Sequence, residues 1–274
     1  MKEKIKRKKQ YLPIKFYKEA IDILDVFTTI ILLSLGEHGT SIKDTIIRNF
    51  IARSIVSLKG ILKLWEEKDY QDCWILHRCI LDRLFHLHAL AKEDAFETFE
   101  KWSFKKQYEY KNKIRSDPYF RDKISPDFFK NMNKNKKRYT DICKEQPQWD
   151  RPKPEEIAKE MDLNFLYKYG YDYASTLVHP MANDGESDFL RQTKLVPEEM
   201  FPDQRAVINN SCLAVVVIVQ EGLNISSLLW RCIMFDFLDN FKIFLQNGSM
   251  DYKESFLKIG SLGPEFDICK KKDI

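Results

Sequence analysis

Apolar residues recur every three or four positions along most of the chain, the spacing that gathers them on one face of a helix. No stretch shows the strict alternation that is typical of half-buried strands. Glycine and proline, which interrupt regular elements, number only nine and ten in 274 residues. We therefore predict an all-α protein: a multi-helix bundle of long antiparallel helices, with a peripheral lysine-rich helical excursion.

Helix ends are marked by capping residues, glycine and proline. Ser41 followed by Asp44 is a capping-box variant, and Ser125 before Pro126 marks a further start. Three prolines between 146 and 154 exclude regular structure there. The predicted helices cover residues 13–35, 41–67, 69–91, 93–110, 154–161, 163–179 and 203–244, the last with Gly222 and Asn224 as kink points.

Composition divides the chain into a bundle and less apolar segments. Residues 1–12 form a basic tail, residues 13–245 the bundle domain, and residues 246–274 a loosely attached C-terminal tail. Lysine and asparagine dominate residues 111–153, which we predict to be a peripheral insertion. The polar segment 180–202 is predicted to be a long loop, which is unusual inside a compact domain and indicates a segment that is either functional or disordered.

The net charge, the cysteines and the apolar runs limit the classes to which the protein can belong. The net charge of +4 from 45 basic and 41 acidic residues permits a local nucleic-acid patch without arguing for one. The six cysteines form no C-x-x-C pair, and four of them lie in strongly apolar helical stretches, which favours buried, reduced core thiols. With no signal peptide, this predicts a cytoplasmic location. The longest apolar runs, 26–35 and 213–219, are too short to span a bilayer, so no membrane partner is expected.

The stretch YKYGYDYASTLVHP, residues 167–180, gathers much of the candidate chemistry. On a helix, Tyr171, Ser175 and His179 stand at i, i+4 and i+8 and share one face. Pro180 ends the helix and leaves an imidazole at its C-terminus, where the helix dipole favours protonated histidine. His179 is thus a candidate general acid or base, and Tyr171 and Ser175 would complete its pocket. The alternative is a C-capping histidine beside tyrosines that only pack.

Two charged residues lie one turn apart on the third predicted helix, among leucines. An unpaired buried charge is costly, so Arg78 and Asp82 are expected to pair with each other or to hold a ligand. A buried ion pair that only joins helices is the alternative. Arg53 on the second helix raises the same question. Because planar guanidinium groups suit phosphate, Arg53 and Arg78 are candidate phosphate ligands, and Asp82 would orient a partner.

Arg83 and His88 satisfy the pattern R-x-x-x-x-H. This pattern resembles that of HEPN ribonucleases, whose arginine and histidine, joined by a second copy through dimerisation, cleave RNA without a metal. The resemblance implies a metal-independent ribonuclease that acts as a homodimer. Leu84 stands where a polar residue commonly follows the arginine. No metal-binding, phosphate-loop, dinucleotide or hydrolase motif is present, so no metal and no cofactor are expected.

The order of these features resembles an uncharacterised family of helical bacterial proteins. Its members carry an arginine on a second helix, R-x-x-x-[E/D] on a third, a tryptophan in a connector, and Y-x-x-x-S-x-x-x-H-P near the end. Asp82 stands where glutamate is usual, which shortens the reach of that carboxylate. The arginine–histidine centre is similar to that of HEPN and abortive-infection proteins, which implies a role in bacterial defence against phage. The matching positions are Arg53, Arg78, Asp82, Trp149, Tyr171, Ser175, His179 and Pro180.

Three functional hypotheses follow. The first is a metal-independent ribonuclease or nucleotide-processing effector of a phage-defence or toxin system, with RNA or a nucleotide as ligand. The second is a non-catalytic sensor for an anionic ligand or an operon-encoded partner protein. The third is a scaffold whose polar residues only fix helix register. The first two predict that His179 lies within hydrogen-bond or one-water reach of Asp82 or Arg78, in a cleft covered by segment 180–202.

Overall fold

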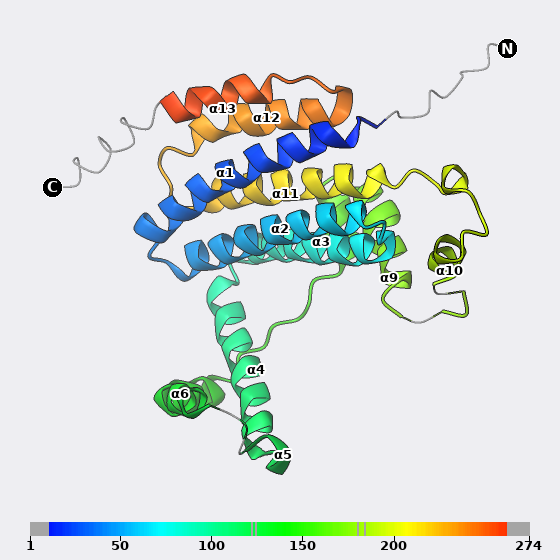
Figure 1. Cartoon of the computed structure of the whole chain (residues 1–274). Helices are drawn as coiled ribbons and strands as arrows, with labels where there is room; N and C mark the ends of the chain where they lie inside the picture. Colours follow the sequence, from blue (N-terminus) through cyan, green and yellow to red (C-terminus); the bar gives the residue numbers. More distant parts are fainter. Residues whose placement is uncertain (1–10, 122, 124, 180, 184, 262–274) are drawn as a thin grey trace.

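The computed structural model of the protein describes residues 11–121, 123, 125–179, 181–183 and 185–261. All regular secondary structure in these residues is helical, so the all-α prediction is confirmed. Figure 1 shows a layered bundle with a helical arm that projects from it. The bundle consists of α1 (Ile14–His38), α2 (Ile42–Glu66), α3 (Tyr70–Glu93), α11 (Arg205–Ile225), α12 (Cys232–Asn247) and α13 (Tyr252–Ser261).

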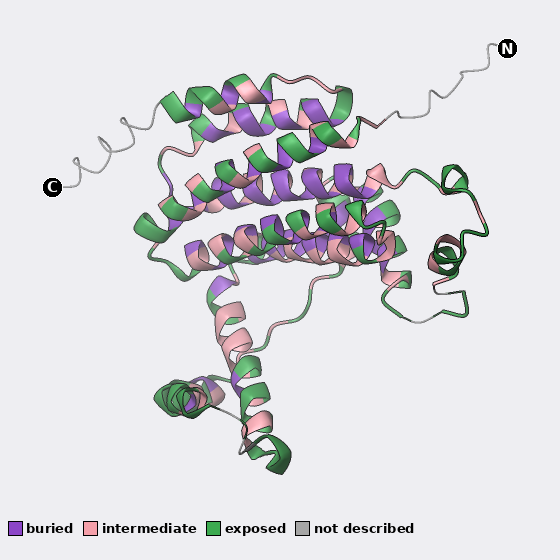
Figure 2. Ribbon diagram, viewed as in Figure 1, coloured by how far each residue is buried: buried purple, intermediate pink, exposed green. Residues whose placement is uncertain are grey.

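The central helix of the bundle is α11, which packs against α1, α2, α3 and α12. Figure 2 shows buried residues along most of its length. By length and composition alone α11 could cross a membrane, but 67% of its apolar window is buried inside the protein. Its composition is therefore that of a central core helix. Gly222 allows the close approach to α2, since a Cβ there would lie 2.8 Å from Ile47 Cγ2.

The predicted start of the second helix is confirmed by its capping contacts. Ser41 Oγ accepts a hydrogen bond from the Asp44 N–H at 2.9 Å. The Asp44 carboxylate is buried and accepts hydrogen bonds from Ser227 N–H at 3.1 Å and Ser227 Oγ at 2.9 Å. Burial acts to raise the pKa of Asp44, but the hydrogen bonds from Ser41 and Ser227 together hold that pKa below its usual value. Asp44 thus ties the turn between α11 and α12 to the start of α2.

The C-terminal part of the chain differs from the prediction. Residues 203–244 form two helices, because α11 ends at Ile225, just after the predicted kink points, and α12 begins at Cys232. The loose tail predicted from residue 246 is wrong for α13, which packs on α12. The Tyr252 ring is fully buried, 5.0 Å from the Phe244 ring. Residues 262–274 and 1–10 of the predicted tails lie outside the described residues.

An arm formed by α4 (Phe96–Ser116), α5 (Pro118–Arg121) and α6 (Pro126–Glu145) projects from the bundle (Figure 1). It contains the predicted excursion but begins earlier, since α4 itself runs outward. We call residues 96–145 the α4–α6 arm. As predicted, α6 starts at Pro126, and residues 146–153 return to the bundle without regular structure.

The cysteines are free thiols within the described part of the chain. Cys73 and Cys212 are buried, whereas Cys79 and Cys143 are partly exposed. Cys232 is exposed at the first residue of α12, so the expectation of core thiols is wrong at this position. Cys269 lies outside the described residues.

Candidate functional site

The helix predicted at 163–179 is broken into short pieces. These are α8 (Asn164–Leu166), the π-helix η1 (Tyr167–Asp172) and α9 (Tyr173–Thr176). A π-helix is rare and is frequently found at functional sites. Here it packs against α3 and places Tyr171 beside Arg78 and Asp82.

The Tyr171 hydroxyl group connects three charged side chains. It donates a hydrogen bond to Asp82 Oδ1 at 3.1 Å. Arg78 Nη2 and Arg151 Nη2 both donate to it, from 3.4 Å and 3.5 Å. The Arg78 guanidinium also lies 4.9 Å from the centre of the Tyr171 ring. We call Arg78, Asp82, Arg151 and Tyr171 the Arg78 centre.

The Arg78 centre holds two guanidinium groups and one carboxylate. Asp82 Oδ1 pairs with Arg151 Nη2 at 2.5 Å, and this hydrogen bond raises the pKa of Arg151 above its usual value. Within the described part of the chain Arg78 makes no ion pair, and its buried Nε has no hydrogen-bond partner. The centre thus has an excess positive charge, with unused donor capacity on Arg78.

Close packing between η1 and α3 positions Tyr171. His77 is fully buried, with Nδ1 2.9 Å from Ser211 Oγ, and burial lowers the pKa of His77 to about 3. His77 is therefore neutral at neutral pH. Gly170 lies against it, since a Cβ at that position would stand 2.6 Å from His77 Nε2 and 3.1 Å from Leu81 Cδ1. Only glycine allows η1 to come this close to α3.

An imidazole lies one turn beyond Asp82 on the same helix. His86 Nδ1 is 2.6 Å from the Asp82 carbonyl oxygen. A carbonyl oxygen can only accept, so Nδ1 carries the proton and Nε2 presents a lone pair when the ring is neutral. Burial lowers the pKa of His86 and favours this neutral form. Its ring lies 5.1 Å from that of Trp149, which also packs on Trp102 at the base of the arm.

Sequence reasoning brought three of these residues together correctly and paired them incorrectly. Arg78, Asp82 and Tyr171 do meet across α3 and η1. The expected Arg78–Asp82 pair is absent from the ion pairs of the described residues, because Asp82 binds Arg151 instead. Arg151 was not predicted, although it lies two positions after Trp149, the connector tryptophan of the family pattern. His86 was missed as well, although it follows Arg78 and Asp82 at the spacing of one helix face.

The helix predicted to extend to His179 ends earlier in the structure. The helix ends at Thr176, so His179 lies in the following turn and is exposed. Among the described residues no hydrogen bond or ion pair connects it with Arg78 or Asp82. Ser175 on α9 donates to the carbonyl oxygen of Tyr171 in the adjoining η1 at 2.7 Å, a local bond one turn back along the chain.

Arg53, Arg83 and His88 lie away from the Arg78 centre. Arg53 is exposed on α2. Arg83 Nη1 donates to the Cys79 carbonyl oxygen at 2.9 Å, on the side of α3 that faces α2. His88 instead lies 3.4 Å from a carboxylate oxygen of Glu221 on α11 and 3.8 Å from one of Glu160, the last residue of α7 (Pro154–Glu160). The two members of the R-x-x-x-x-H pattern therefore serve different helix contacts within one chain.

Segment 180–202 contains α10 (Glu186–Gln192) and the 3-10 helix η2 (Glu198–Met200), so it is not the uninterrupted loop that was predicted. A cleft of about 370 Å³ lies between this segment and α3. Trp74, Tyr173 and Arg191 line it, whereas His179 and the Arg78 centre are not part of its wall. No three metal-ligating side chains gather among the described residues in a way that would hold an ion.

The fold and the Arg78 centre thus define an all-helical protein with a cationic polar centre on its third helix. Residues 44–194 match a family of unknown function, DUF5677, and since this is more than half of the chain, the protein belongs to that family. The matched range includes α3, the arm, the connector and η1. No curated protein and no solved structure shows significant similarity to the chain.

Proposed function

We propose that the protein binds a phosphate-bearing ligand, a nucleotide or RNA, at the Arg78 centre. The observation that carries this proposal is the charge imbalance, in which two guanidinium groups share one carboxylate and a buried Nε of Arg78 has no partner among the described residues. Guanidinium groups bind phosphate oxygens through paired, planar N–H donors. A bound phosphate would supply both the missing negative charge and the missing acceptor.

Each member of the centre has a separate task in this proposal. Arg78 supplies donors to the ligand and is held in place by stacking over Tyr171. Asp82 fixes the orientations of Arg151 and of the Tyr171 hydroxyl group through its two hydrogen bonds. Arg151 is half exposed, so its remaining donors face solvent and approaching ligands. Asp82 also reduces the positive charge of the centre, which leaves two guanidinium groups against one carboxylate.

The biological setting is proposed from the resemblance to HEPN and abortive-infection proteins. In that setting the protein is a cytoplasmic sensor of phage-defence or toxin systems, and an operon-encoded partner protein supplies the effector chemistry. Ligand binding at the junction of α3, η1 and the connector would signal through the base of the arm, where Trp149 packs.

Arg78→Ala is expected to abolish stabilisation by ligand. A ligand present at about 100 times its Kd adds roughly 2.7 kcal/mol to the stability of the state that binds it. We expect at least one member of a panel of nucleoside mono-, di- and triphosphates and cyclic dinucleotides to raise the Tm of the wild-type protein. That rise should be absent in Arg78→Ala. It should be retained in Arg48→Ala, because Arg48 is a partly exposed arginine on a different helix, α2. An equal rise in all three proteins, or none in the wild type, would contradict the proposal.

A second candidate function is metal-independent RNA cleavage by a homodimer, and His86 favours it. The neutral ring offers its Nε2 lone pair one turn from Asp82. As general base, His86 would take the proton of a ribose 2′-hydroxyl, whose oxygen then attacks the adjacent phosphorus. The 5′-oxygen leaves with a proton from water, and Arg78 and Arg151 stabilise the charge that develops on the phosphate.

Cleavage of total RNA should depend on His86 under this second candidate. We expect His86→Ala to lower the cleavage rate by about 100-fold or more, as is typical for loss of a general base. His38→Ala, at the exposed end of α1, and His179→Ala should retain the wild-type rate. Cleavage by His86→Ala at the wild-type rate, or no cleavage by the wild type, would exclude this candidate and leave the binding proposal standing.

A further inference from the structure

Positive charge is concentrated in the outer part of the α4–α6 arm. Residues 105–138 contain twelve lysines and arginines against four acidic residues, a net charge of +8, whereas the whole chain carries +4. The remaining residues therefore carry a net charge of −4. A small overall charge thus hides a strong separation between a cationic arm and an anionic bundle. Such a separation is a footprint of binding to polyanions.

Most of these cations make no ion pair with another described residue. At the base of the arm, Arg138 pairs with Glu100 and Lys101 pairs with Glu145. Farther out, acidic residues are too few to pair with the lysines. Uncompensated positive charges repel one another, so binding of an external polyanion would stabilise the arm electrostatically. Within the described residues, no ion pair is made by Lys105, Lys111, Lys113, Arg115, Lys130, Lys134, Lys136 or Lys137.

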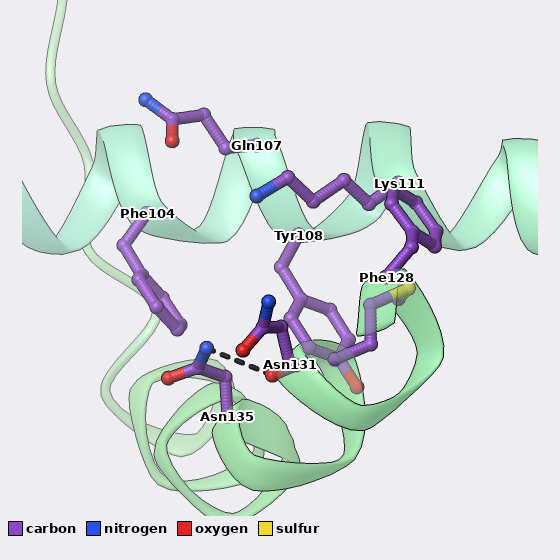
Figure 3. A pocket seen from close by; sticks show the side chains of 8 residues that line it. Phe104, Gln107, Tyr108, Lys111, Phe128, Asn131 and Asn135 are labelled. Carbon is purple, nitrogen blue, oxygen red and sulfur yellow. Dashed lines mark hydrogen bonds between the residues drawn. The ribbon is translucent and has the colours of Figure 1, made fainter. Parts of the chain in front are cut away.

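A small pocket opens between α4 and α6 in this cationic region (Figure 3). Its volume of about 120 Å³ is well below the roughly 300–1,000 Å³ of sites that enclose a whole small-molecule ligand. It can therefore take one ring of a longer molecule. Its wall combines aromatic rings, carboxamides and one ammonium group, from Phe104, Tyr108, Phe128, Gln107, Asn131, Asn135 and Lys111.

The chemistry of this wall fits a nucleobase. Aromatic side chains stack on bases, and asparagine and glutamine pair with base edges through adjacent donors and acceptors. Asn135 donates through Nδ2 to the Asn131 carbonyl oxygen at 3.0 Å, which holds its amide in place (Figure 3). The side-chain carboxamides of Asn131 and Gln107 make no hydrogen bond within the described part of the chain. Lys111 would then hold the phosphate of the same nucleotide.

Further aromatic rings lie exposed at the tip of the arm. Tyr110 and Tyr119 are each 67% exposed, and Phe120 is 43% exposed. Lys123 Nζ lies 3.5 Å from the centre of the Tyr119 ring, so a cation and a stacking surface are presented together. Alternating cations and exposed rings are characteristic of surfaces that bind single strands, because each base offers a face for stacking.

We propose that the α4–α6 arm binds single-stranded nucleic acid, with one base in the α4–α6 pocket and the phosphates along its unpaired lysines. A single strand is favoured over a duplex because the pocket needs an unstacked base. A membrane surface fits less well, since an interfacial helix needs a free apolar face. The apolar side of α6 is occupied within the arm, where Met132 and Ile142 are buried. This inference concerns other residues than the Arg78 centre.

The experiment measures fluorescence anisotropy of labelled oligonucleotides of about twelve nucleotides, a length within the range bound by single-strand domains. The full chain is titrated with single-stranded RNA, single-stranded DNA and duplex DNA at increasing salt. We expect tighter binding of single strands than of the duplex, and a logarithm of affinity that falls linearly with the logarithm of salt concentration. Comparison of RNA with DNA then shows which single strand the arm prefers.

Charge and pocket variants separate the two parts of the proposal. Lys134→Glu with Lys137→Glu should weaken binding about tenfold or more at low salt. Asn131→Ala, which removes an exposed carboxamide from the pocket, should weaken it roughly fivefold or more without changing the salt slope. A control with the same charge change, Lys15→Glu with Lys63→Glu on the bundle, should bind within about twofold of the wild type.

Three outcomes would overturn the proposal. They are wild-type affinity in the Lys134/Lys137 variant, absence of oligonucleotide binding at low salt, and tighter binding to anionic phospholipid vesicles or to polyglutamate than to the oligonucleotides. The fold-loss of affinity caused by Lys134→Glu with Lys137→Glu is expected to be the same in an Arg78→Ala background as in the wild type, because the Arg78 substitution leaves the arm unchanged. Failure of the Arg78 centre and failure of the arm are thus observed separately.

Discussion

Phe237→Ala is expected to lower the free energy of unfolding by about 3–5 kcal/mol, the largest effect of any single truncation proposed here. The Phe237 ring is fully buried and stacks on Phe27 with 4.1 Å between ring centres, which joins α12 to α1. Removing the ring loses its burial and leaves a cavity between the two helices. Urea denaturation followed by circular dichroism measures the change.

The matched control for this truncation is Phe189→Ala. Phe189 is 56% exposed on α10, so the same chemical change should cost less than about 0.5 kcal/mol. A loss below about 1 kcal/mol in Phe237→Ala would show that α12 does not pack on α1 in this way.

Gly170→Ala is expected to lower stability by about 1–3 kcal/mol, the usual cost of forcing an extra methyl group into a packed contact. The new Cβ would stand 2.6 Å from Nε2 of His77. His77 is fully buried and cannot move aside, so η1 must shift away from α3. That shift moves Tyr171 away from Arg78 and Asp82. The free energy of unfolding and the rise in Tm caused by ligand should therefore both be smaller in this variant than in the wild type.

Gly36→Ala provides the comparison for this substitution. Gly36 lies in α1 with nothing within 4 Å of an added Cβ, so alanine there should be neutral or stabilising by roughly 0.5–1 kcal/mol. If Gly170→Ala behaved like Gly36→Ala, the close approach of η1 to α3 would not be a feature of the folded protein.

Most helices of the bundle could be predicted from the periodic spacing of apolar residues. The start of α2 followed from its capping residue, because Ser41 Oγ accepts a hydrogen bond from the Asp44 N–H. The start of α6 followed from Pro126, because proline is tolerated in the first turn of a helix. The π-helix could not be seen in the same way, because the residues Tyr167–Asp172 have an ordinary helical composition. The π-helix depends on a tertiary contact between Gly170 and His77, which are 93 positions apart in the sequence. Local sequence patterns do not reveal a contact over that distance.

The sequence predicted the members of the candidate site on α3, Arg78 and Asp82, but not which side chains form its ion pair. Buried charges need partners, and this argument correctly brought Tyr171 to Arg78 and Asp82. It could not reveal that Asp82 binds Arg151, since the partner comes from an irregular connector. The prediction of one helix face shared by Tyr171, Ser175 and His179 was wrong, because the π-helix changes the register and α9 ends at Thr176.

The central claim is that the Arg78 centre binds the phosphate of a ligand, and calorimetric titration with inorganic pyrophosphate tests it most directly. The wild-type protein should bind one pyrophosphate per chain at this centre. Arg78→Ala and Arg78→Lys should each bind at least about tenfold more weakly, because lysine keeps the charge but lacks the planar pair of donors. Arg48→Ala should match the wild type. Equal affinity in all four proteins, or no binding to the wild type, would contradict the claim.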